Sequence, residues 1–157
     1  MELWLTKRAA LTPQAPALLL NGASTSFSAL DAFVSETALR LRSAGVCEGD
    51  FVASLLGNGL PFVALLHAVA RCGAVLLPLN LRLTPPELAF QLQEAQPRLL
   101  LHETGGLAER AREASALAHV QHLRVLDWET FSQLPIEDAS TPSGAPPLRE
   151  TLDLEPQ

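Results

Sequence analysis

Residues 51–92 read FVASLLGNGLPFVALLHAVARCGAVLLPLNLRLTPPELAFQL, and this stretch decides the fold. Its first part, 51–56, is apolar except for Ser54, which is typical of a strand covered on both faces, as in a parallel sheet. A proline then opens an apolar helix over 61–72, and the apolar run 74–79 forms the next strand. Strand, helix and strand in this order predict a right-handed βαβ unit.

The residues before this unit predict a hairpin and a helix. Short strands over 17–20 and 24–27 flank Asn21-Gly22-Ala23, which favours a tight turn. Apolar residues then recur at helical spacing from Leu30 to Leu41, and Ser28 with Asp31 suits a capping box at the helix start. We therefore expect an amphipathic helix that covers one face of a sheet, with Asp31 on its solvated side.

The alternation continues beyond residue 80. Thr84-Pro85-Pro86-Glu87 is a capping box, and the helix that it opens is ended by Pro97. A strand over 99–101, a helix over 107–118 and a strand over 120–126 follow. The sequence therefore predicts an α/β fold, with an open, doubly wound, mostly parallel sheet, helices on both faces and a small N-terminal β-hairpin.

Composition bounds the domain organisation and the partners. The 157 residues suffice for one domain, which we place at 1–136, and the segment 137–157, with four prolines and no periodicity, is typical of a linker. A net charge of -6 argues against nucleic-acid partners. The apolar run 60–79 is interrupted by His67 and Arg71, so we expect no membrane span, and with no export signal we expect a cytoplasmic protein.

Several local patterns have structural explanations. Cys47 and Cys72 lack CxxC spacing and suit reduced core positions, and Gly57-Asn58-Gly59 is interpreted as a strand-to-helix turn rather than a phosphate loop. His67 lies in an apolar helix and is expected to be a hydrogen-bonded core histidine. His119 and His122, with Asp127 nearby, fall at a helix end, which does not favour a metal site. We predict no metal ligands and no catalytic residues in this chain.

The segment ARCGAVLLPLNLRLTPPEL resembles the early part of the AMP-forming acyl-CoA synthetases, in which the glycine, the Pro-Leu-Asn run and the Thr-Pro-Pro-Glu cap occur in the same order. TSFSALDAFVSETALRLRSAGVCEGDFVASLLGNG is similar to the first core motif of that adenylate-forming family, and the resemblance covers about residues 3–135. Within the family, WLTKRAALTPQAPALL and PLNLRL look most like the 2-succinylbenzoate-CoA ligases of menaquinone biosynthesis. Long-chain, medium-chain and aryl acyl-CoA synthetases share most of the pattern, so the substrate stays open.

The resemblance implies a two-step reaction of the complete enzyme. A carboxylic acid attacks Mg-ATP to form an acyl-adenylate, and CoA then displaces AMP. The family's phosphate loop ends near a lysine, and a second essential lysine lies in its C-terminal domain. Here Lys7 is the sole lysine, in no glycine-rich context, and the chain ends about where the strand before that loop should start. We therefore expect an N-terminal fragment that binds none of ATP, Mg2+ or CoA tightly and cannot adenylate alone, with 137–157 leading towards the nucleotide-binding part.

Ligands of open α/β sheets bind beyond the carboxyl ends of the strands. In this sequence those ends are followed by Gly57–Gly59, Asn80–Arg82, His102–Thr104 and Asp127–Trp128. Asn80 and Arg82 are the candidate substrate-binding residues, because a guanidinium pairs bidentately with a carboxylate or phosphate of an acyl or CoA ligand. The alternative is a helix-entry loop in which Arg82 pairs with a surface acid.

Two other classes of protein remain open. A receiver or flavodoxin-like module has the same alternation, but a receiver needs paired acids and a lysine on a later strand, and no lysine follows Lys7. A non-catalytic α/β interaction domain would dock its apolar sheet edge onto another chain. For the ligase fragment itself, the resemblance implies a second, similar sheet in the complete enzyme, so apolar helix surface left bare here would favour a homo-oligomer.

Overall fold

The computed structural model describes residues 4–136 and consists of a four-stranded sheet between two helical layers, with a separate hairpin. The elements in chain order are α1 (Trp4–Leu11), β1 (Pro16–Leu20), β2 (Ala23–Ser26), α2 (Phe27–Ser43), β3 (Phe51–Leu55), α3 (Leu60–Arg71), β4 (Val75–Pro78), α4 (Pro85–Ala95), β5 (Leu99–His102), α5 (Gly106–Ala118), β6 (Arg124–Asp127) and α6 (Trp128–Ser132). The predicted linker over 137–157 lies outside the described residues.

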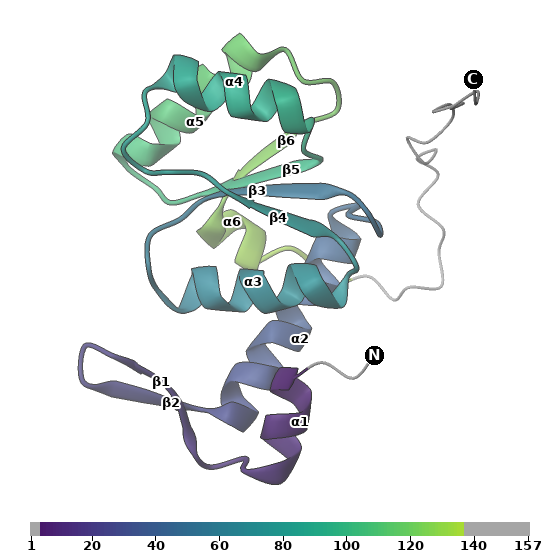
Figure 1. Ribbon diagram of the computed structural model, residues 1–157, viewed down its shortest axis with the longest axis vertical. Helices are drawn as coiled ribbons and strands as arrows, with labels where there is room; N and C mark the ends of the chain where they lie inside the picture. The colour runs from purple at the N-terminus through teal and green to yellow at the C-terminus, as the bar shows by residue number, and fades with distance from the viewer. Residues whose placement is uncertain (1–3, 137–157) are drawn as a thin grey trace, which may run out of the picture.

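The main sheet has the strand order β4-β3-β5-β6, and every neighbouring pair is parallel. Helices α4 and α5 lie on one side of the sheet, and α3 and α6 lie on the other (Figure 1). The predicted doubly wound α/β fold with helices on both faces is confirmed. The βαβ unit predicted over residues 51–79 is the β3-α3-β4 segment.

Strand β3 is buried on both faces, which explains its apolar sequence. Val52 packs in the core shared with α2 and α3, whereas Ala53 and Leu55 pack in the core shared with α4 and α5. Successive side chains of a strand point to opposite faces, so a strand between two cores needs apolar residues at nearly every position. Ser54 is the exception, and it is only 1% exposed.

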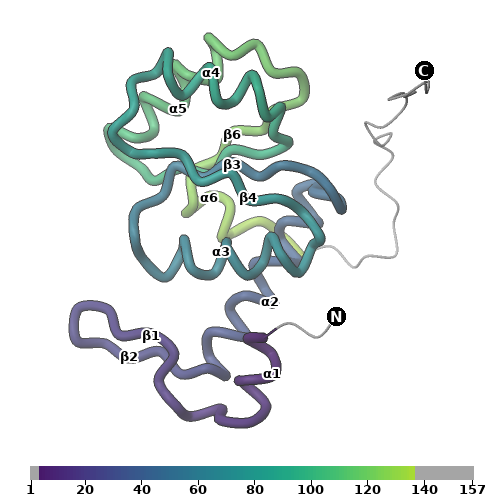
Figure 2. Tube along the Cα trace, in the orientation of Figure 1, coloured from purple at the N-terminus to yellow at the C-terminus, as the bar shows by residue number. Residues whose placement is uncertain are grey.

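The N-terminal hairpin is confirmed, with a two-residue turn at Asn21-Gly22. Both residues have positive φ, 50° and 81°, as a type I′ turn requires. The hairpin and α1 lie at the end of the molecule away from α4 and α5, and α2 carries the chain from the hairpin to the sheet, as the trace in Figure 2 shows.

Helix α2 begins two residues earlier than predicted, because its cap is Ser26 rather than Ser28. Ser26 is the N-cap, and its side chain accepts a hydrogen bond from the amide of Ala29 at 3.2 Å. The strand before it ends at Ser26, so Phe27 enters the helix and is only 9% exposed. The proposed capping box of Ser28 and Asp31 is therefore wrong. At the other end of the helix, Gly45 adopts the left-handed conformation, with a φ of 87°.

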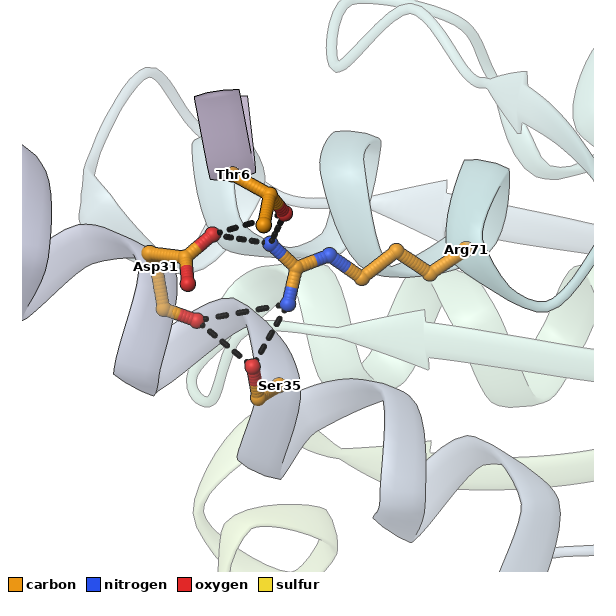
Figure 3. Close-up of polar contacts among 4 residues, drawn as sticks. All are labelled: Thr6, Asp31, Ser35 and Arg71. Atoms are coloured by element: carbon orange, nitrogen blue, oxygen red, sulfur yellow. Dashed lines mark hydrogen bonds and ion pairs between the residues drawn. The ribbon is translucent and has the colours of Figure 1, made fainter. Parts of the chain in front are cut away.

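Asp31 pairs with Arg71 instead of lying on a solvated face. The Arg71 guanidinium contacts the Asp31 carboxylate, donates to Ser35 Oγ, and donates to Thr6 Oγ1 at 3.0 Å (Figure 3). Thr6 in turn donates to Asp31 Oδ1 at 3.1 Å. This Thr6–Asp31–Ser35–Arg71 cluster joins α1, α2 and α3.

The capping interaction at the start of α4 is confirmed. The Glu87 carboxylate accepts hydrogen bonds from the Thr84 amide at 2.8 Å and from Thr84 Oγ1 at 2.7 Å. These two bonds hold the pKa of Glu87 below its usual value of 4.5.

The last strand, β6, is shorter than the strand predicted over 120–126, and it spans Arg124–Asp127. His119 and His122 both have positive φ, which turns the chain before the strand.

The predicted burial of Cys47 needs correction, and two leucines of the helical layers are partly exposed. Leu66 of α3 is 46% exposed, and Leu117 of α5 is 48% exposed. Both cysteines are free, but only Cys72 is a core residue, because Cys47 is exposed. Desolvation raises the pKa of the Cys72 thiol, and the charge of Arg42 has a smaller, opposite effect.

Within residues 4–136 no helix combines the length and hydropathy needed to cross a bilayer.

Candidate functional site: a cleft between β3 and β4

The carboxyl ends of the four strands lie along one edge of the sheet because the strands are parallel. The chain winds from β3 to β4 in one direction and from β5 to β6 in the other, so the switch point lies between β3 and β5. Open α/β sheets bind ligands at this edge, often with phosphates at the switch point. Two hollows occur here, one beside the switch point and one between β3 and β4.

The switch point is occupied by a side chain of the protein. Glu103, just after β5, accepts a hydrogen bond from the amide of Gly57, just after β3, at 2.7 Å. The adjacent hollow of about 220 Å3 is lined by Pro61, Glu103, Thr104, Trp128 and Glu129. The carboxylates of Glu103 and Glu129 would repel a phosphate. The Gly57 amide, which could otherwise donate to a phosphate, already donates to Glu103. This edge of the described residues is therefore unsuited to a triphosphate.

The second hollow, which we call the β3–β4 cleft, has a volume of about 440 Å3. It is lined by Ser54, Leu56, Asn58, Phe62, Pro78, Leu79, Asn80, Leu81 and Arg82. Its lining is mixed: five of these residues are apolar, and the polar ones are Ser54, two asparagines and Arg82, which is the only charged residue. Small-molecule sites combine apolar side chains with a few convergent polar groups, and the single guanidinium favours an anionic ligand.

Asn80 and Arg82, the two residues predicted to bind substrate, therefore both line one cleft. The loop that carries them is well braced. Asn80 Oδ1 accepts from the Arg82 amide at 3.0 Å, and the carbonyl of Leu81 accepts from Arg110 Nη1 at 2.7 Å. The backbone amide of Leu79 joins the loop to β3 through the Ser54 carbonyl at 2.9 Å.

The Arg82 side chain is exposed, and within residues 4–136 its guanidinium makes no hydrogen bond or ion pair. The alternative in which Arg82 pairs with a surface acid is thus not realised in the described part of the chain. An unpaired guanidinium at the lining of the cleft is available for an anion.

Ser54 also lines the cleft, and its sequence pattern did not identify it as a site residue. Its side chain is buried, and its hydroxyl is the one buried side-chain polar atom in the described residues that has no hydrogen-bond partner. The signal was a single polar residue in an otherwise apolar buried strand. Such a residue can equally bond to a neighbouring backbone group, so the pattern alone did not single it out.

The histidines do not form a metal centre. His67 is half-buried and stacks on Trp4 with ring centroids 6.2 Å apart, and within residues 4–136 it makes no hydrogen bond, contrary to expectation. Burial and the charge of Arg71 lower the pKa of His67 below 6.5. His119 and His122 are exposed, and the described residues hold no group of three metal-binding side chains.

The sequence of the chain matches one protein family over nearly its whole length. The family model described as AMP-binding enzyme matches residues 5–155. The chain belongs to the AMP-binding enzyme family. The resemblance to acyl-CoA synthetases inferred from the sequence motifs is thereby confirmed.

AMP-binding enzymes similar to this chain are longer. The 2-succinylbenzoate--CoA ligase of Geobacillus kaustophilus is 36% identical over 155 residues, which cover 99% of this chain and 28% of that enzyme. A feruloyl-CoA synthase of an Amycolatopsis species is 37% identical over 122 residues, 78% of this chain and 24% of that enzyme. The chain therefore spans less than a third of the relatives that it matches.

Solved structures agree with the fold. The O-succinylbenzoate coenzyme A synthetase of Bacillus subtilis, in complex with ATP and magnesium ion, superposes with a TM-score of 0.77 at 28% identity, covering 88% of this chain and 36% of that one. The same Bacillus subtilis enzyme has been solved with its acyl-adenylate intermediate, with a TM-score of 0.76 at 26% identity.

Proposed function

We propose that this chain is the N-terminal part of an ATP-dependent acyl-CoA ligase, in which the complete protein activates a carboxylic acid as an acyl-adenylate and transfers it to CoA. The match to AMP-binding enzymes over residues 5–155 carries this proposal. The acid that we favour is 2-succinylbenzoate, because curated relatives at up to 36% identity over nearly the whole chain bear that name. An aryl acid is the second candidate, supported by the feruloyl-CoA synthases at 37% identity.

The described residues do not suit ATP. A triphosphate needs cationic side chains and a loop of backbone amides around it. The carboxyl edge instead carries Glu103 and Glu129, and the sole lysine, Lys7, is exposed in α1. We therefore assign the binding of ATP and Mg2+ to parts of the ligase outside residues 4–136. The purified chain, incubated with Mg-ATP and aryl acids, is expected to release no pyrophosphate, and release above a no-acid control would contradict this assignment.

The role that we assign to the described residues is to hold the anionic end of the acid or of CoA in the β3–β4 cleft. Arg82 supplies the charge, and Asn80 fixes the Arg82 backbone through its 3.0 Å hydrogen bond. The apolar lining residues suit a carbon skeleton, and the unpaired guanidinium suits a carboxylate or phosphate.

Arg82→Ala in a ligase that contains this segment tests the role. We expect the KM for the acid or for CoA to rise about ten-fold with little change in kcat, because loss of one charge-assisted hydrogen bond costs about 1.5 kcal/mol. The matched control is Arg112→Ala, which removes an exposed arginine from α5, away from the lining of the cleft. Unchanged KM values for both substrates would remove Arg82 from the site.

A further inference from the structure

The buried hydroxyl of Ser54 differs from the half-buried serine hydroxyls of Ser35 and Ser115. Ser35 and Ser115 donate to the carbonyls of Asp31 and Ala111 one helical turn earlier, at 2.8 Å and 2.6 Å. Ser54 is in a strand, where no such carbonyl is within reach, and its own carbonyl already accepts from Leu79. Its side chain is 1% exposed and its hydroxyl has no partner in the described residues.

An unpaired buried hydroxyl is unfavourable for folding, because the group loses its hydrogen bonds to water and gains none. Alanine at this position would avoid the cost, as the small side chain of Ala53 does on the opposite face of β3. An orphan group of this kind requires an explanation. Ser54 lines the β3–β4 cleft together with Arg82, so a bound molecule could supply the missing partner.

We propose that Ser54 Oγ donates a hydrogen bond to a carbonyl group of the ligand whose anionic end is held by Arg82. The inference rests on the proposed function of the cleft and adds the chemical class of its ligand: an anion with an apolar body that carries a neutral carbonyl. The partner is an acceptor because the unbonded hydroxyl proton is the group that most needs one. It is neutral because Ser54 is buried and Leu56 and Phe62 are among the lining residues, so a second charge at this position would be costly.

Calorimetric titration of the 157-residue chain with paired probes tests the proposal. Benzoylpropionate has an aryl ring, a ketone and a carboxylate, and phenylbutyrate has a methylene in place of the ketone. We expect the natural chain to bind the keto acid about five-fold more tightly, the effect of one hydrogen bond, and Ser54→Ala to bind both equally. Phosphopantetheine, which carries amide carbonyls and a phosphate, forms a second arm and distinguishes a CoA-type ligand from a free acid.

Thermal unfolding separates a binding role from a structural one. Ser54→Ala should unfold at the same temperature as the natural chain or higher, because it removes an unpaired polar group, whereas a hydroxyl with a structural partner would make the variant less stable. Ser24→Ala, at an exposed position of β2, is the matched control.

The outcomes separate this inference from the proposed function. If Ser54→Ala keeps the preference for the ketone, or if the natural chain has none, Ser54 does not contact the ligand and the inference is wrong. If Arg82→Ala nevertheless weakens binding of both acids, the anion-binding role of the cleft stands. If the natural chain binds none of the probes at millimolar concentration, both proposals fail.

Discussion

Asp31 in α2 and Arg71 in α3 form an ion pair that joins the two helices through side chains only 23% and 14% exposed. The pair does not stand alone, since Thr6 of α1 bonds to both partners. Removal of one charge would leave the other partly desolvated and unpaired, and this penalty exceeds the value of an exposed ion pair.

We therefore expect Asp31→Ala to lower the free energy of unfolding by about 2 kcal/mol, less than for a fully buried pair because water still reaches the carboxylate. Glu36→Ala is the matched control. It also removes an acid of α2 that pairs with an arginine, but the Glu36 side chain is 46% exposed, and the expected cost is about 0.5 kcal/mol. Urea unfolding measures both, and equal losses would show that burial of the Asp31 pair has no energetic consequence.

Glu103 is expected to hold the β3–α3 loop through the amide of Gly57. In Glu103→Ala the amide loses its acceptor, and its hydrogen exchange should become roughly five-fold faster. Glu103→Gln keeps an acceptor oxygen and should retain most of the protection. Glu129→Ala removes the other carboxylate of the same hollow without affecting this bond, so acceleration in that variant would contradict the assignment.

Gly73 lies between α3 and β4 and adopts a backbone conformation that favours glycine. Its φ is 69°, and an added Cβ would lie 2.9 Å from Glu48 Cγ. Gly73→Ala should destabilise the protein by about 1–2 kcal/mol, through backbone strain and displacement of Glu48. Gly106→Ala, where nothing lies within 4 Å of the added atom, should be neutral or stabilise by about 0.5 kcal/mol. A melting temperature unchanged by Gly73→Ala would argue against the left-handed backbone.

The cap of α4 predicts a pH dependence. Hydrogen bonds from Thr84 lower the pKa of Glu87 in the folded protein, so the carboxylate stabilises the fold above its unfolded pKa, near 4.5. This contribution is lost as the pH falls through the lowered folded value. The difference in melting temperature between the natural chain and Glu87→Gln should therefore be largest at neutral pH and disappear in strong acid. Glu94→Gln, a loss of charge in the same helix outside the cap, should show a smaller difference at neutral pH.

Much of the fold follows from local patterns in the sequence. The capping residues Thr84 and Glu87 and the apolar strand β3 each satisfy a requirement of their own segment, and they were predicted at their observed places. The turn predicted over Asn21-Gly22-Ala23 is present, but it is one residue shorter because Ala23 belongs to β2. The short helices α1 and α6 were not predicted. Helix α1 is anchored by contacts with residues far along the chain, such as that of Trp4 with His67, which no local pattern indicates.

Part of the candidate site could also be predicted from the sequence. Asn80 and Arg82 follow a strand of a predicted parallel sheet, so their location at the carboxyl edge could be inferred from topology alone. That Glu103 occupies the switch point and that Ser54 lacks a partner both depend on distances between β3 and its neighbours. Such distances exist only in the folded chain.

Pro78 affects hydrogen bonding at the outer edge of β4, which is an edge strand of the sheet formed by the described residues. The amides of Val75 and Leu79 point towards β3, where they donate to Asp50 and Ser54. Alternation along the strand therefore turns the nitrogen of Pro78 outward, where proline has no hydrogen to offer. A strand from another molecule that paired with this edge would lack one backbone hydrogen bond at Pro78, next to the β3–β4 cleft. Pro78 therefore disfavours self-association through strand pairing at this position.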